Sequence, residues 1–194
     1  MVTVAADMRD PAPVQALFAA ADRLGDLTGL VNSAGRSECQ AAFVDIDSDR
    51  WARILAVNVN VIGTAMCCRH AVTRMTAHGR GGSIVNLSSR AAVLGSPNED
   101  VDDAASTAVV DTLTRGLALE VADQSIRVNA VRPGIIDTDF HRAAGDPTRA
   151  NRLAVSQPMG RCGTPHEVAD AIAWLLSDQA SFITGTTLDV SGGR

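Results

Sequence analysis

The first residues that could do chemistry are four carboxylates within five positions: Glu99, Asp100, Asp102 and Asp103. They open a long stretch of helical pattern. Such a group could hold a divalent cation, or one member could act as a base. Acidic side chains are also favoured in the first turn of a helix, where they interact with the helix dipole and cap free N–H groups. We prefer this second interpretation and expect no metal site.

A second chemical feature is what the chain lacks. All 17 basic residues are arginine, and there is no lysine and no tyrosine. A mechanism that needs an amine or a phenol therefore has no side chain to supply it. The four cysteines, Cys39, Cys67, Cys68 and Cys162, lack the spacing of metal ligands, so we expect buried, reduced thiols.

Composition excludes several classes of partner. The net charge of -5, without a basic cluster, argues against nucleic acid or an anionic membrane surface. No apolar run approaches the roughly 20 residues of a membrane span, and the N-terminus lacks the pattern of a signal peptide. We therefore expect a cytoplasmic protein with a single domain over residues 1–194.

Short β-branched runs alternate with longer stretches of helical period, which predicts an α/β fold with a parallel sheet. The strand candidates are residues 2–6, 27–32, 83–89, 126–133 and 184–192. Helices are predicted over 11–24, 48–77 and 101–121, and a fourth starts at Thr164, where Pro165 and Glu167 complete a capping box. In the second helix, one apolar stripe comprises Trp51, Ile54, Leu55, Asn58 and Ile62. Residues 140–163 are irregular and typical of a binding loop.

Small and polar residues follow three of these strands, at the edge where open parallel sheets bind ligands. They are Asn32-Ser33-Ala34-Gly35, Ser88-Ser89, and Arg132-Pro133-Gly134 with Ile136 and Thr138 beyond. Each stretch taken alone is also typical of a turn. Asn58 is a further candidate, because an amide on an apolar stripe needs either hydrogen-bond partners or a function. A satisfied core amide remains the open alternative.

Taken together, these stretches resemble the short-chain dehydrogenase/reductase (SDR) family. The motifs are VNSAG (31–35), LAVNVNVIGT (55–64), SIVNLSS (83–89), LTRGLALEVADQSIRVNAVRPGIIDTDFH (113–141) and ITGTTLDVSGG (183–193). They cover the whole chain in the family's order and most resemble the sugar- and 3-oxoacyl-type reductases. The resemblance implies a Rossmann-like doubly wound sheet flanked by helices, NAD or NADP as cofactor, a small-molecule alcohol or ketone as substrate, and a homo-oligomer, dimer or tetramer.

The resemblance also implies roles for individual residues. The cofactor's adenine would contact Asp7 and Met8, its ribose would lie near strand 27–32, and its nicotinamide would be held after strand 126–133. The candidates for these last two contacts are Asn32, Ala34, Gly35, Pro133, Gly134, Ile136 and Thr138. Asn58 would support a proton-relay water, and Ser89 would hydrogen-bond the substrate oxygen.

One departure from the family concerns the cofactor. The family begins with a strand, a turn of the form T-G-x-x-x-G-x-G, a helix and a second strand, and its strand order is 3-2-1-4-5-6-7. This chain starts at the third strand, so we expect it to lack the first β-α-β unit. Because that turn binds the pyrophosphate through backbone N–H groups, NAD or NADP binding should be weakened or lost. Either strand 2–6 moves beside strand 27–32, giving five strands, or the sequence is N-terminally truncated.

The other departure concerns catalysis. Asp103 and Thr107 occupy the positions of the family's acid/base tyrosine and its lysine. A carboxyl group with a reference pKa of about 3.9 is ionised near neutral pH, so it cannot protonate a carbonyl oxygen and repels the developing alkoxide. Thr107 supplies no charge, so we expect no cation to organise the site. The candidate catalytic positions are thus Asn58, Ser89, Asp103 and Thr107.

Three hypotheses follow. The chain is an NAD(P)-dependent oxidoreductase that is inactive or severely impaired, a pseudoenzyme. Alternatively, it keeps the fold for assembly or ligand binding, through helices 48–77 and 101–121, where the small residues Ala104, Ala105, Ala108 and Gly116 suit close packing. A third possibility is an altered chemistry with Asp103 as the base.

Overall fold

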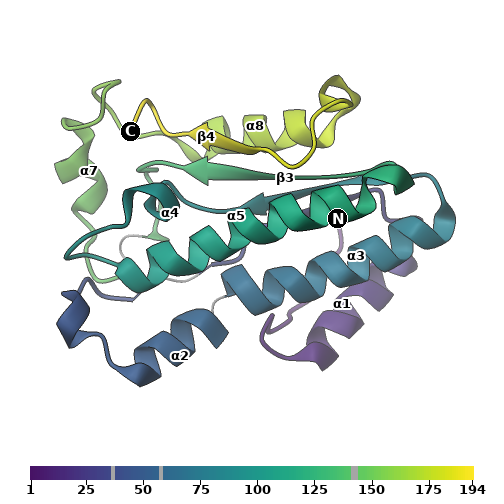
Figure 1. The fold of residues 1–194 in the computed structure, drawn as a ribbon, viewed down its shortest axis with the longest axis horizontal. Helices are drawn as coiled ribbons and strands as arrows, with labels where there is room; N and C mark the ends of the chain where they lie inside the picture. Colours follow the sequence, from purple (N-terminus) through teal and green to yellow (C-terminus); the bar gives the residue numbers. More distant parts are fainter. Residues whose placement is uncertain (36–37, 57–58, 141–143) are drawn as a thin grey trace.

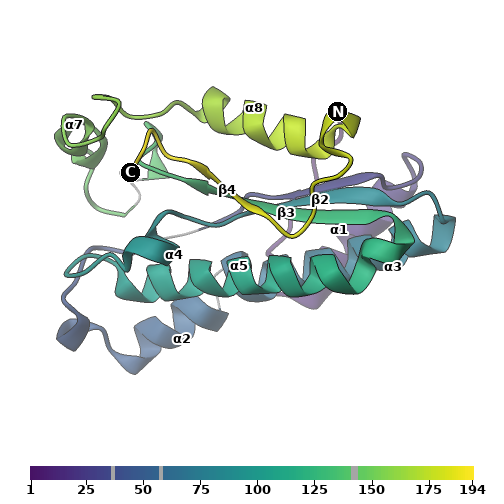
Figure 2. The same ribbon diagram turned by 45° about the horizontal axis from the view of Figure 1, so that its top comes forward.

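The computed structural model describes residues 1–35, 38–56, 59–140 and 144–194, and it has the expected α/β architecture. A four-stranded parallel sheet, in the order β1-β2-β3-β4, lies between two layers of helices (Figures 1 and 2). The strands are β1 (Gly29–Asn32), β2 (Gly82–Leu87), β3 (Ile126–Pro133) and β4 (Thr187–Val190). The order of the strands in the sheet is also their order in the chain, and all neighbouring strands are parallel. Each strand is therefore joined to its neighbour by a crossover connection.

Helices cover both faces of the sheet. On one face lie α1 (Pro11–Asp22), α3 (Thr64–His78) and α5 (Val101–Val121), with α2 (Ser48–Ala56) packed beside α5. On the other face lies α8 (Pro165–Leu176). The shorter elements are η1 (Phe43–Asp45), η2 (Val59–Gly63), α4 (Ala91–Leu94), η3 (Ala122–Gln124), α7 (Arg149–Ala154) and η4 (Asp178–Ala180).

The central strands are buried on both faces. Ile84 of β2 and Val128 of β3 pack into one core with α1, α3 and α5. Val85 and Val131, on the opposite faces of the same strands, pack into a second core with α8. This burial explains why the strands read as continuous apolar runs, as parallel strands covered on both sides do.

The predicted strand over residues 2–6 does not form, so the five-stranded rearrangement is wrong. Residues 1–6 have no regular secondary structure, and most of their side chains are exposed. Among the described residues, β1 pairs with β2 alone. A β-branched run is only a local preference, and a strand also needs a neighbouring backbone with which to form hydrogen bonds.

The predicted helix 48–77 is divided by η2, a π-helical turn between α2 and α3. A π-turn takes in an extra residue and shifts the side chains beyond it around the helix axis. The predicted stripe is only partly buried: Ile54 is 3% exposed, whereas Leu55, before this turn, and Ile62, within it, are exposed. The candidate Asn58 lies outside the described residues.

The capping box at the start of α8 is confirmed. The Thr164 hydroxyl accepts a hydrogen bond from the Glu167 N–H, and the Thr164 N–H donates to the Glu167 carboxylate at 2.8 Å. Hydrogen bonds from Arg161 are the main reason that the pKa of Glu167 is lowered to about 2. At the other end of α8, the Arg127 guanidinium donates to the carbonyls of Leu175 and Leu176. Local sequence thus sets the start of this helix, and a distant arginine satisfies its end.

Two further expectations need correction. All four cysteines are free thiols, and Cys67 and Cys68 are buried, but Cys39 is exposed. Burial raises the pKa of the Cys68 thiol to about 12. The stretch 140–163, expected to be irregular, contains the helix α7.

None of the described helices is long and apolar enough to cross a membrane. No group of three or more potential metal-binding side chains gathers within the described ranges.

Candidate active site

A cavity of about 460 Å³ opens at the carboxyl ends of the strands, where ligands bind in open parallel sheets. Its walls come from the segments that follow β1, β2 and β3, the first turns of α5, α7 and one face of α8. The apolar part of the lining includes Leu87, Leu94, Ile135, Ile136, Phe140, Val168 and Ile172. An apolar chamber with a few polar groups is the usual form of a small-molecule site.

Most of the predicted site residues meet in this cavity. Those that line it are Ala34, Gly35, Ser89, Asp103, Thr107, Pro133, Gly134, Ile136 and Thr138. They come from four separate segments of the chain, which the parallel sheet brings to one edge.

Three predicted cofactor contacts lie away from the cavity. Asp7 is exposed and pairs with Arg9, whose hydrogen bonds lower the pKa of that carboxyl to about 2. Met8 packs against the core beside Cys67. The Asn32 amide donates to the Asn86 side chain at 2.8 Å. These three contacts remain predictions, because the resemblance alone supports them.

Ser89 and Thr107 have opposite hydrogen-bonding states. The Ser89 hydroxyl oxygen accepts a hydrogen bond from the Ala91 N–H at 3.1 Å, which leaves its own proton available for a ligand. The Thr107 hydroxyl donates its one proton to the carbonyls of Asp103 and Ala104, both at 3.1 Å. Thr107 is also only 4% exposed. Ser89 can therefore hydrogen-bond a ligand oxygen, whereas the Thr107 hydroxyl is committed to its own helix.

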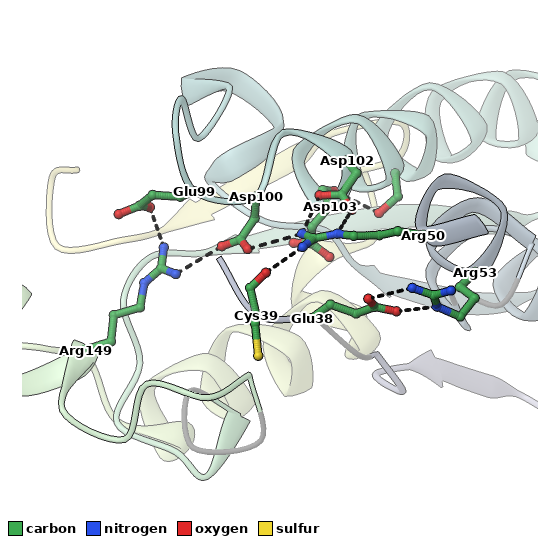
Figure 3. A network of polar contacts seen from close by, with 10 residues as sticks. Glu38, Cys39, Arg50, Arg53, Glu99, Asp100, Asp102, Asp103 and Arg149 are labelled. Carbon is green, nitrogen blue, oxygen red and sulfur yellow. Dashed lines mark hydrogen bonds and ion pairs between the residues drawn. The ribbon is translucent and has the colours of Figure 1, made fainter. Parts of the chain in front are cut away.

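The acids at the start of α5 form ion pairs with two arginines (Figure 3). Asp102, which has no exposed surface, accepts hydrogen bonds from Arg50 of α2 at 2.6 and 3.0 Å. A third Arg50 nitrogen donates to the Cys39 carbonyl. The hydrogen bonds to Asp102 are the main cause of a raised pKa for the Arg50 guanidinium. The pair therefore fixes α2 to α5 by a buried, bidentate contact.

Arg149, the first residue of α7, holds the neighbouring acids. Its guanidinium donates to Asp100 at 3.0 Å and to Glu99 at 2.5 Å, and Arg149 is itself 9% exposed. Arg50 also approaches Asp100, at 3.8 Å. Burial raises the pKa of Asp100, and the hydrogen bond from Arg149 opposes this effect. We call these five residues, Arg50, Glu99, Asp100, Asp102 and Arg149, the arginine network.

The arginine network corrects two expectations. The acids were expected to interact with the helix dipole and to cap the helix; Asp102 and Asp103 do lie in the first turn of α5, but Asp100, at the N-cap position, makes no side-chain capping hydrogen bond. No cation was expected at the site, yet Arg149 lines the cavity together with Asp100 and Asp103. Sequence reasoning missed both arginines because they lie about 50 positions from their partners and carry no local motif.

Gly134 allows the chain to approach itself closely at the cavity wall. Its N–H donates to the Val190 carbonyl at 3.0 Å. A Cβ atom at this position would lie 2.8 Å from the Ser191 Cα and 2.9 Å from the Ser191 carbonyl oxygen. Both of these contacts are to backbone, so a side chain here would displace the segment after β4.

We predict that Gly134→Ala lowers the free energy of unfolding by about 1–3 kcal/mol, because the methyl group overpacks a backbone contact. Denaturant unfolding would measure the change. Gly116→Ala is the matched control, since a Cβ atom at this position of α5 would have no atom within 4 Å, and alanine there should be neutral or stabilising. Equal stability of the Gly134→Ala variant and the unmodified protein would contradict the prediction.

Comparison with known proteins places the chain in a family. A family model described as enoyl-(acyl carrier protein) reductase matches residues 1–194. An uncharacterised oxidoreductase of Escherichia coli K12, YgfF, is 49% identical over 192 residues, which are 97% of this chain and 77% of that protein. The chain belongs to the short-chain dehydrogenase/reductase family.

Two further comparisons bear on this SDR chain. A protein of Xanthobacter autotrophicus, named inactive 2-(S)-hydroxypropyl-CoM dehydrogenase 2, is 41% identical over 196 residues, covering 98% of this chain and 83% of that protein. The crystal structure of a 3-ketoacyl-(acyl-carrier-protein) reductase from Brucella melitensis, complexed with NADH, superposes with a TM-score of 0.89 at 33% identity. The match covers 98% of this chain and 77% of that one. By sequence and by fold, the chain is an SDR-family oxidoreductase.

Proposed function

We propose that this SDR protein carries the ligand cavity of an NAD(P)-dependent alcohol/ketone oxidoreductase but is inactive or severely impaired in that reaction. The main support for this proposal is Thr107, which occupies the position of the family's lysine. Its hydroxyl group is buried and donates hydrogen bonds to the backbone of its own helix. Neither charge nor a free proton is available from it.

Reduction of a ketone requires a proton at the oxygen as the hydride reaches the carbon. Ser89 can hydrogen-bond that oxygen, since its hydroxyl proton is available. Asp103, at the position of the tyrosine, carries a carboxyl group with a reference pKa of about 3.9, and an ionised carboxylate has no proton to give near neutral pH. The sequence contains no tyrosine or lysine that could replace the relay from elsewhere.

The cavity residues fit one end of a dinucleotide. Gly134 has no room for a Cβ, and beside it Pro133, Ile136 and Thr138 line the cavity at the place assigned to the nicotinamide. When bound, NAD(P) would supply or accept the hydride. The pyrophosphate end fits less well, because the 194 residues contain no T-G-x-x-x-G-x-G turn. We infer weakened NAD or NADP binding, and the solved relative with NADH supports the choice of cofactor class.

The relative from Xanthobacter supports an impaired function, since its name describes a protein of this family as inactive. The four free thiols accord with a cytoplasmic location, which we also propose. A third proposal is that Asp103 acts as the base in a different reaction, for which the cavity does not indicate a substrate.

A second candidate function is assembly or binding without catalysis, with the chain as a homo-oligomer. The supporting observation is the exposed side of α5, which presents Ala105, Val109, Gly116 and Leu119 to solvent. Leu119 is 65% exposed. Ala104, expected among the contact residues, is buried inside the subunit and is not available for such packing.

The proposal is tested by binding and turnover measured separately. Titration of the protein with NADH and NADPH, followed by fluorescence, should give weak or undetectable binding. A panel of ketones and secondary alcohols should show no turnover beyond the uncatalysed rate. Saturable micromolar binding would contradict the weakened cofactor site, and turnover abolished by Ser89→Ala would contradict the loss of catalysis. Size-exclusion chromatography with light scattering would test the oligomer.

A further inference from the structure

The last four residues of the chain form a fixed turn at the cavity. The Arg194 N–H donates to the Ser191 carbonyl at 3.3 Å, and the Ser191 hydroxyl donates to the Arg194 carbonyl at 3.2 Å. Gly192 and Gly193 supply the turn with φ angles of 62° and 91°, which other residues rarely adopt. The turn packs against the cavity residue Gly134, and this packing places Arg194 in the cavity lining.

Arg194 differs from the other cations of the cavity. Of the residues that the structure describes, three arginines line it: Arg90, Arg149 and Arg194. Arg90 binds Asp189 at 2.6 Å, and Arg149 binds two acids of the arginine network. The Arg194 guanidinium has no ion pair and no side-chain hydrogen bond within the part of the chain that the structure describes. It is half-buried, so part of its hydration is already lost.

Near β3 and β4, Asp111 and Asp189 pair with Arg90 and Arg132, so neither acid is paired with the Arg194 guanidinium. At the start of α5, Asp100 and Asp103 line the cavity, and Asp100 pairs with Arg149 and lies 3.8 Å from Arg50. The apolar lining described above lies in the same chamber. The cavity therefore suits an apolar ligand with an anionic group at one end.

We propose that Arg194 forms an anion subsite that binds the carboxylate or phosphate group of the ligand in this cavity. A guanidinium offers a planar set of donors that matches either group, and hydrogen bonds to a charged partner are stronger than neutral ones. Apolar walls strengthen the interaction by excluding water. The inference rests on the proposed function only in taking the same cavity as the ligand site; it needs neither dinucleotide binding nor turnover.

Calorimetry with three probes tests the subsite and identifies the source of the anion. Hexanoate carries a carboxylate on an apolar chain, hexan-1-ol is its neutral counterpart, and nicotinamide mononucleotide carries the phosphate of a cofactor. We expect hexanoate or the mononucleotide to bind the unmodified protein. Arg194→Ala should weaken that binding about tenfold, which is at the lower end of the effects of losing a hydrogen bond to a charged group. Arg194→Lys should retain part of the affinity, and any binding of hexan-1-ol should not change.

Arg69→Ala is the matched control, because it removes an exposed arginine of α3 whose side chain lies away from the cavity lining. It should leave all three affinities unchanged, and the melting temperatures of the variants would show that each is folded. Unchanged anion binding in Arg194→Ala would overturn the proposal. So would the failure of both anionic probes to bind the unmodified protein. NADH titration of the same variants reports separately on the proposed function.

Discussion

Asp102→Ala is expected to lower the free energy of unfolding by about 3–5 kcal/mol, because it leaves the Arg50 guanidinium buried without its carboxylate. Asp102 has no exposed surface and Arg50 is 8% exposed, so water cannot replace the lost partner without opening the contact between α2 and α5. The remaining partners of Arg50 are the uncharged Cys39 carbonyl and Asp100, which lies 3.8 Å away and already binds Arg149, so they compensate the charge only in part. Equilibrium unfolding in urea, followed by circular dichroism, would measure the loss.

Two further variants separate the ion pair from general damage to α5. Glu120→Ala removes an exposed acid from the same helix and should change stability by less than about 0.5 kcal/mol. The double variant Arg50→Met with Asp102→Leu removes both charges and should be more stable than Asp102→Ala alone, since no uncompensated charge remains. If Asp102→Ala unfolds at the same urea concentration as the unmodified protein, the pair contributes nothing to stability.

The second large effect concerns catalysis. In a chain that carries a grafted glycine-rich strand-turn-helix unit at its N-terminus, Asp103→Tyr together with Thr107→Lys should raise ketone reduction about 10²- to 10⁴-fold over the graft alone. The phenol would supply the proton that a carboxylate cannot, and the nearby ammonium would lower the pKa of the phenol towards neutral pH. The loss of NAD(P)H absorbance with a panel of ketones would report the rate.

The two substitutions should act together. Tyr alone lacks the cation that lowers its pKa, and Lys alone has no acid to assist, so either single variant should recover little activity. Ser89→Ala in the restored chain should abolish the gain, because the Ser89 hydroxyl is placed to hydrogen-bond the substrate oxygen and its proton is available. A restored chain that binds NADH but reduces no ketone would show that the cavity departs from the family in more than these two positions.

Local sequence patterns predicted the helices and strands that are determined by residues close together in the chain. The runs that became β2 and β3 are apolar because both faces of the sheet are covered, and the start of α8 follows from a threonine, a proline and a glutamate within four positions. The meeting of Ser89, Asp103 and Gly134 in one cavity was also predictable, because parallel strands bring their carboxyl ends to the same edge.

The rest depended on contacts between distant parts of the chain. Residues 2–6 have the composition of a strand but pair with no other strand among the residues that the structure describes, and composition does not report pairing. The π-helical turn that interrupts the predicted helix 48–77, and that contains the exposed Ile62, is not anticipated by a regular helical period. The partners of Arg50 and Arg149 lie 52 and 49 positions along the chain from them, and acids at a helix start give no sign of which cation will approach.

Both cations of the arginine network are guanidinium groups. Its ion pairs are therefore resistant to high pH and to reagents that modify amines. An arginine stays protonated up to a pH of about 12, so raising the pH does not discharge the links from α2 and α7 to α5. Reagents and enzymes that acylate lysine find no side-chain target anywhere in the 194 residues. The cationic half of this ionic framework is therefore constant, and changes in its charge balance must come from the carboxylates.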